Sequence, residues 1–147
     1  MRADISFPLP LRTAYFVDAA ASGAMGVLLL LTTGPLAPAL GLPAALLRAS
    51  GAVLVPFAAL LAGLAARTDR AHGGATRALG WAVVVGNVLW TLASVVLVAD
   101  VVTPTASGEA FVLAQAAAVA ACAVLEATAL RAIGRASLGR ASLVGAR

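Results

Sequence analysis

Hydrophobic and polar positions separate along this chain into long apolar runs and short polar or turn-rich stretches. Each apolar run reaches the roughly 20 residues that a helix needs to cross the hydrocarbon core of a bilayer. Lipid offers no water to backbone groups, so each run has to satisfy its own hydrogen bonds as a helix. We therefore expect spans over about residues 14–32, 44–66, 79–99 and 110–130.

The stretches between these runs are "TTGPLAPALGLP", "RTDRAHGGATR" and "DVVTPTASGE". Connections this short favour antiparallel neighbours, and the prolines and glycines of the first one are expected to break the helix there. The fold class that follows is all-α, a four-helix transmembrane up-down bundle. Residues 1–131 are expected to form this single domain, and residues 132–147 a flexible, basic cytoplasmic tail.

Composition supports a membrane location and excludes several functions. The 147 residues are 62% hydrophobic and 11% charged, whereas soluble domains carry about 25% charged residues. The net charge is +4, but the arginines do not form the stripe expected of a nucleic-acid binder. One cysteine and one histidine provide neither an internal disulfide nor a metal cluster. We expect membrane lipids as the surroundings, no nucleic acid and no cofactor.

The arginines indicate which way the bundle is oriented. Basic residues accumulate on the cytoplasmic side of membrane proteins. Only Arg48 falls on the other side of the predicted bundle, so both termini are expected in the cytoplasm, with the protein in the bacterial inner membrane. The arginines on the cytoplasmic side are Arg2, Arg12, Arg67, Arg70, Arg77, Arg131, Arg135, Arg140 and Arg147.

The first 39 residues also fit a different interpretation. Arginines, an apolar run and the A-x-A match at Ala37–Ala39 are typical of a secretory signal peptide. Cleavage there would leave three spans. Against this alternative, Asp18 lies inside the apolar run, and the stretch is long for a signal.

Polar residues within the spans are the candidate functional site. Ionisable side chains in membrane helices usually face the bundle interior or a water-filled cavity. Asp18 in the first span and Glu126 in the fourth are expected at similar depth, in a small cavity that opens inward, where they could share a proton. Asn87 and Gln115 are candidates for the same site. The alternative is that all four residues only join helices through hydrogen bonds.

A second candidate site is expected at the outer face. Arg48 begins the second span, and Asp100 and Glu109 flank the last connection. Their depths match, so an ion pair or contact with an anionic group is expected there. Snorkelling of Arg48 toward water is the simpler explanation.

Several segments carry a resemblance. With "VDAAASGAMGVLLL", "GLPAALLR" and "NVLWTLAS", the chain resembles small four-span bacterial integral membrane proteins of unknown function. It is similar to small multidrug resistance transporters in span count and in its first-span acid, and to DoxX-type proteins in span count and size. It is longer than the former and has a stronger arginine bias.

Three functions remain open from the sequence. The first is a non-enzymatic accessory subunit, or a binder of lipid or of a small hydrophobic ligand. The alternative is a small proton-coupled transporter that uses Asp18 and Glu126. The second alternative is a lipid- or quinone-linked enzyme, which is disfavoured because no catalytic set is visible in the sequence. A homo-oligomer or a larger membrane complex is expected in each case.

Overall fold

Four long helices make up the computed structural model, which describes the backbone of residues 10–67 and 74–145 and the side chains of residues 10–67 and 77–136. All four are long and apolar enough to cross a membrane. They are α1 (Leu11–Leu40), α2 (Ala44–Arg67), α3 (Gly74–Val96) and α4 (Ala106–Gly145), and a π-helical turn, η1 (Leu97–Val101), extends α3. The all-helical class predicted from the apolar runs is confirmed.

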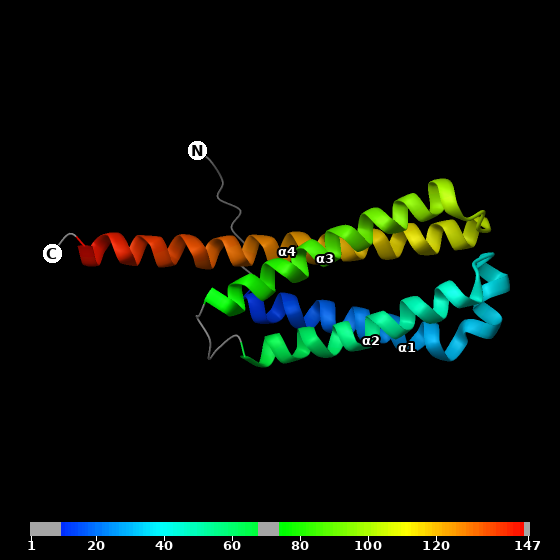
Figure 1. Cartoon of the computed structure of the whole chain (residues 1–147), viewed down its shortest axis with the longest axis horizontal. Coiled ribbons are helices and arrows are strands. Elements are labelled where there is room, and N and C mark those ends of the chain that lie inside the picture. The colour runs from blue at the N-terminus through cyan, green and yellow to red at the C-terminus, as the bar shows by residue number, and fades with distance from the viewer. Residues whose placement is uncertain (1–9, 68–73, 146–147) are drawn as a thin grey trace.

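The helices lie side by side as two pairs, α1 with α2 and α3 with α4, and contacts between α1 and α4 join the pairs (Figure 1). Residues 41–43 and 102–105, which connect the helices within each pair, lie at one end of the bundle. We call this the connection end. The opposite end, where α1 and α3 begin and α2 ends, carries Arg12, Arg67 and Arg77, and we call it the arginine end.

The bundle exposes apolar side chains and buries polar ones. Leu31, Leu89 and Val124 are 79%, 60% and 62% exposed, whereas Asp18 and Glu126 are almost completely buried. Water favours the opposite distribution, because burying a polar group costs free energy and exposing apolar surface does too. This surface fits a lipid environment.

Small residues bring α1 and α2 into close contact. A Cβ atom added at Gly51 would lie 2.8 Å from the carbonyl oxygen of Gly26, and one added at Gly26 would lie 3.0 Å from the Cβ of Leu54. Close approach through small residues is how helices pack where no hydrophobic force drives them together. Gly26 thus faces α2, whereas Ser22, one turn earlier, faces Asp18.

The helix break predicted in "TTGPLAPALGLP" is confined to residues 41–43. Helix α1 continues through Pro35 and Pro38, although an interior proline removes one N–H donor and its ring crowds the carbonyl four residues earlier. A loop would leave many more backbone groups without partners in lipid. The helix ends at Gly41 with a left-handed φ of 63°, where the N–H of Leu42 bonds the carbonyl of Ala37 in a Schellman-type cap.

The backbone of the predicted C-terminal tail is helical over most of its length. Helix α4 runs through residues 132–145 without interruption, and the alanine, leucine and arginine content of this stretch suits a helix. The flexibility of the tail stays a prediction. Arg2, Arg70 and Arg147 lie outside the described residues, as does the side chain of Arg140.

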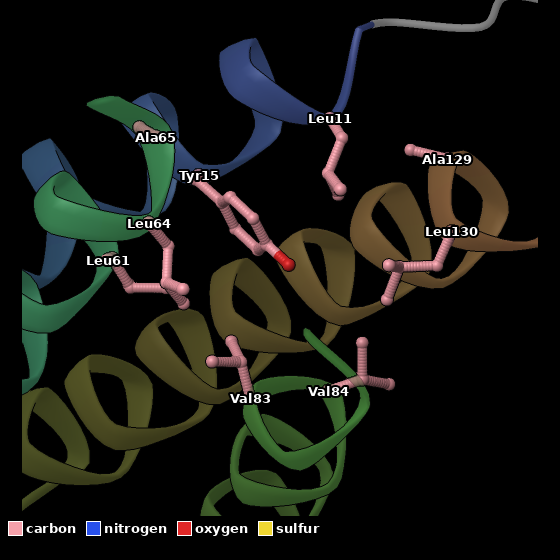
Figure 2. Packing of buried hydrophobic residues seen from close by; sticks show 9 residues of the cluster. All are labelled: Leu11, Tyr15, Leu61, Leu64, Ala65, Val83, Val84, Ala129 and Leu130. Carbon is pink, nitrogen blue, oxygen red and sulfur yellow. The ribbon is translucent and has the colours of Figure 1, made fainter. Parts of the chain in front are cut away.

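Two clusters of buried apolar side chains lie at different levels of the bundle. The arginine-end cluster has members from all four helices, and Figure 2 shows them around Tyr15. The connection-end cluster includes Leu29, Leu47 and Val112. The members of the arginine-end cluster are Leu11, Tyr15, Leu61, Leu64, Ala65, Val83, Val84, Ala129 and Leu130.

Candidate functional site

A group of hydrogen-bonded polar side chains lies inside the bundle. The amide nitrogen Nδ2 of Asn87 donates to Oδ2 of Asp18 at 2.7 Å and to Oε2 of Glu126 at 3.3 Å. The hydroxyl of Ser22 donates to Oδ1 of Asp18 at 2.8 Å. We call these four residues the polar cluster.

Three helices supply the polar cluster. Asp18 and Ser22 are four residues apart on α1 and so share one face of it. Asn87 comes from α3 and Glu126 from α4. The helical period places the polar residues of each span on one face, which we call a polar stripe. Asp18, Asn87 and Glu126 meet because α1 contacts α4 and α3 contacts α4.

The three side chains are buried almost completely. Asp18, Asn87 and Glu126 are 1%, 3% and 0% exposed. Oxygen Oε1 of Glu126 has no hydrogen-bond partner among the described residues. A buried carboxylate oxygen without a donor is costly, and two neighbouring negative charges repel each other strongly away from water. Oε1 of Glu126 is therefore a buried acceptor that the described side chains leave unsatisfied.

Apolar side chains enclose the polar cluster, which was predicted to open inward. Val83 and Val84 precede Asn87 by one turn and belong to the arginine-end cluster, as do Ala129 and Leu130, one turn beyond Glu126. Ser22 is followed, two turns along α1, by Leu29 of the connection-end cluster. The polar cluster thus lies between the two apolar clusters, and its opening toward the cytoplasm stays a prediction.

Tyr15 is a residue of this region that the sequence placed elsewhere. Its position near the start of the first span suggests a side chain at the membrane interface, but the ring is 0% exposed. Its hydroxyl points away from α1 into the bundle, and it has no hydrogen-bond partner in the described part of the chain (Figure 2). Gly80 leaves room for it, since a Cβ there would lie 2.5 Å from this hydroxyl. Its spacing of three residues from Asp18 places both side chains on the same face of α1, as the helical period predicts.

Gln115 lies beside the polar cluster but makes no hydrogen bond to it in the part of the chain that the structure describes. It lines a cavity of about 80 Å³ together with two members of the cluster, Asp18 and Ser22. Its Nε2 lacks a hydrogen-bond partner within the described residues. Gln115 precedes Glu126 by eleven residues, or about three turns, on the same helix, so the two cannot reach one another directly.

The residues predicted for the outer face lie at the connection end but stay apart. Arg48, Asp100 and Glu109 are all exposed, and no ion pair joins them in the part of the chain that the structure describes. The predicted contact with an anionic group stays a prediction.

Backbone carbonyls and hydroxyls make the polar contact at this end. The N–H of Thr105 donates to the carbonyl of Leu40 at 3.0 Å, and the hydroxyls of Thr105 and Ser107 each donate to the carbonyl of Ala39 at 3.0 Å. We call this the connection-end latch. The hydroxyl of Thr105 also accepts from the N–H of Gly108 at 3.2 Å, as an N-cap residue does. The latch therefore uses the start of α4 to satisfy the last carbonyls of α1.

A second hollow, larger than the cavity beside Asp18, lies on the surface between α3 and α4. It is an open groove of about 440 Å³, which we call the α3–α4 groove. Its lining includes Trp81, Val88 and Leu92 of α3 and Val124, Thr128 and Arg131 of α4.

No group of three or more His, Cys, Asp or Glu side chains that could hold a metal ion occurs among residues 10–67 and 77–136. Cys122 is buried and unpaired with another cysteine. The chemistry available to the polar cluster is therefore that of carboxyl, amide and hydroxyl groups, which is proton transfer and hydrogen bonding. Comparison with protein families, curated proteins and solved structures finds no match to this chain.

Proposed function

We propose that the chain is a multi-pass protein of the bacterial inner membrane, an up-down bundle with both termini in the cytoplasm. The support is the arginine distribution: Arg12, Arg67 and Arg77 lie on helix termini at one end, and Arg48 lies in the first turns of α2 at the other. Positive side chains stay preferentially on the cytoplasmic side. The arginine end then faces the cytoplasm.

We infer further that the protein is a small proton-coupled carrier whose polar cluster holds the coupling proton. The observation that carries this proposal is the bridge from Asn87 to both Asp18 and Glu126 at the centre of a bundle with an apolar surface. Ionisable groups at such positions are costly and typically mark ion or proton pathways. A purely structural contact could be made by uncharged side chains at lower cost.

Binding or loss of one proton at the polar cluster changes the contacts between the helices. With one carboxyl group protonated, the pair carries a single negative charge, which Asn87 and Ser22 stabilise by hydrogen bonds. Loss of that proton leaves two buried negative charges that repel across α1 and α4. Separation of the α1–α2 and α3–α4 pairs relieves this repulsion and admits water or a cation.

The space beside Asp18 suffices for water but not for a larger substrate. The cavity beside Asp18 has about 80 Å³, whereas pockets for small molecules usually have about 300–1,000 Å³. Transport therefore requires the two pairs to move, as in carriers that alternate access by rocking one half against the other.

A direct measurement of the proton tests this proposal. Infrared difference spectra of the protein in lipid vesicles, recorded between acidic and alkaline pH, should show the C=O stretch of a buried protonated carboxyl group. Asp18→Asn and Glu126→Gln should each alter or abolish this band, and Glu109→Gln, which changes an exposed acid, should leave it unchanged. A band insensitive to both buried substitutions contradicts the proposal.

Transport is tested in the same vesicles with tetraphenylphosphonium as the cationic probe and a pH gradient as the driving force. We expect gradient-driven movement of the probe that falls at least tenfold in Asp18→Asn and Glu126→Gln, while Glu109→Gln retains it. Equal movement in all variants would eliminate the carrier.

The α3–α4 groove favours the other function expected from the sequence, a binder of lipid or of a small hydrophobic ligand. The accessory-subunit function remains a proposal, and mild detergent extraction followed by native mass spectrometry tests it through the partners that remain bound.

A further inference from the structure

The α3–α4 groove has two chemically different parts. Along most of its length it is lined by valine, leucine and alanine side chains, and at the arginine end it reaches Trp81 and Arg131. The guanidinium group of Arg131 lies over the ring of Trp81, 5.9 Å from its centre. The apolar part of the α3–α4 groove thus ends beside a positive charge.

A second arginine lies near this end of the groove. A Cβ atom added at Gly134 would lie 2.5 Å from Nη2 of Arg77, so the side chain of Arg77, at the start of α3, reaches across to α4. Gly134 follows Arg131 by three residues and so lies on the same side of α4. Arg77 and Arg131 thereby bring two positive charges together from neighbouring helices.

The hydroxyl groups that line the groove already have hydrogen-bond partners. Thr91 donates to the carbonyl of Asn87 at 2.9 Å, and Thr128 donates to the carbonyl of Leu125 at 2.9 Å. Both hydroxyls are thus satisfied by their own helices. A polar molecule would find few hydrogen-bond partners along the groove, whereas an alkyl chain has no hydrogen bonds to lose there.

We propose that the α3–α4 groove binds one anionic phospholipid, with an acyl chain along the apolar part and the phosphate beside Arg77 and Arg131. Basic pockets between helices on the cytoplasmic side suit anionic headgroups, and arginine binds phosphate oxygens through its paired N–H donors. The proposal depends on the membrane placement of the arginine end and is independent of the carrier function.

Fluorescence quenching by lipid tests the proposal, because Trp81 lines the groove. Replacement of the second tryptophan, Trp90→Phe, makes Trp81 the sole emitter. In vesicles of phosphatidylglycerol and phosphatidylcholine, with bromine on the chains of one lipid at a time, brominated phosphatidylglycerol should quench Trp81 more at equal mole fraction. The attraction between one arginine and an anionic lipid surface corresponds to a preference of about fivefold for phosphatidylglycerol over phosphatidylcholine.

Removal of the charges should remove the preference for the anionic lipid. Arg131→Gln and Arg77→Gln, each normalised to its own emission without bromine, should reduce the ratio of quenching by the two lipids toward one. Arg48→Gln is the matched control, since Arg48 is also exposed but lies at the connection end. Equal quenching by the two lipids in the Trp90→Phe protein overturns the proposal.

Filling the groove provides a measurement that does not depend on fluorescence. Ala120 lines the groove and Ala121 is exposed on another face of the same helix. Native mass spectrometry of protein extracted with phosphatidylglycerol should show one retained lipid, reduced at least threefold by Ala120→Phe and unchanged by Ala121→Phe. Circular dichroism checks that each variant folds. If Ala120→Phe does not fold, the smaller substitution Ala120→Leu is measured in its place. Equal lipid retention in the variants at positions 120 and 121 also contradicts the proposal.

Discussion

The α1–α2 pair and the α3–α4 pair are built differently, although both consist of two apolar helices of similar sequence composition. Gly26 and Gly51 bring the backbones of α1 and α2 into contact. Helices α3 and α4 contact each other less extensively, and a groove stays open on the surface between them. One pair is therefore close-packed, and the other has space for a ligand.

Two polar contacts join these pairs, one at the centre and one at the connection end. Asn87 connects α3 to both carboxyl groups, and Thr105 connects the start of α4 to the end of α1. These two polar contacts determine the position of the α1–α2 pair relative to the α3–α4 pair. Substitutions at the two contacts and at the glycines can therefore separate the stability of each pair from the stability of the whole.

The largest loss of stability is expected for Asn87→Leu, which removes the donor shared by two buried carboxyl groups. The cost is about 3 kcal/mol, because each acid loses a hydrogen bond while remaining buried. Denaturation in mixed micelles, followed by circular dichroism, measures it. The double variant Asn87→Leu, Glu126→Gln should recover part of the lost stability, because Asp18 is then the one buried acid left in the polar cluster. Strictly additive costs would show that Asn87 does not couple to Glu126.

A smaller loss is expected for Gly51→Ala, at about 2 kcal/mol. The new methyl group would lie 2.8 Å from the carbonyl oxygen of Gly26 and has to push α1 and α2 apart. Gly86→Ala makes the same change at an exposed position of α3, where it meets no neighbour, and alanine favours the helix by up to about 1 kcal/mol. The two substitutions should therefore shift the unfolding midpoint in opposite directions. Equal shifts would mean that the contact between Gly51 and Gly26 does not limit the packing of α1 against α2.

The smallest effect is expected at the connection-end latch. Thr105→Val removes the hydroxyl that donates to the carbonyl of Ala39 and caps α4, at a cost of about 1 kcal/mol. Faster hydrogen exchange at the amide of Gly108 should report the lost cap directly. Thr103→Val, two residues earlier in the same connection and also exposed, is the control that should leave this exchange unchanged.

The sequence predicts the four helices because hydropathy over whole segments determines them, and segment length is easily read. It also predicts the polar stripes that hold Asp18, Asn87 and Glu126, since these follow from the helical period. Which stripes meet depends on the rotation and tilt of each helix, and these follow from contacts such as that of Gly26 with α2. The same rotation determines that Gln115 lines the cavity beside Asp18.

Local backbone chemistry accounts for the other differences. Proline suggests a break at residues 35 and 38, but the lipid penalty for unpaired backbone groups outweighs the loss of two N–H donors. Thr105 precedes an apolar run, a signal for a helix N-cap, but its second role at the end of α1 depends on a contact between distant segments. Tyr15 is buried because Gly80 lets α3 approach it, and neither residue alone indicates the other.

The bridge from Asn87 to Asp18 has a consequence for the order of synthesis. The two residues are 69 positions apart, so α1 and α2 leave the ribosome well before the amide that completes the cluster. Until α3 arrives, the carboxyl group of Asp18 has the hydroxyl of Ser22 as its partner on the same helix. The first two helices can associate early through their glycines, but the nascent protein reaches its final stability only when its second half is inserted beside them.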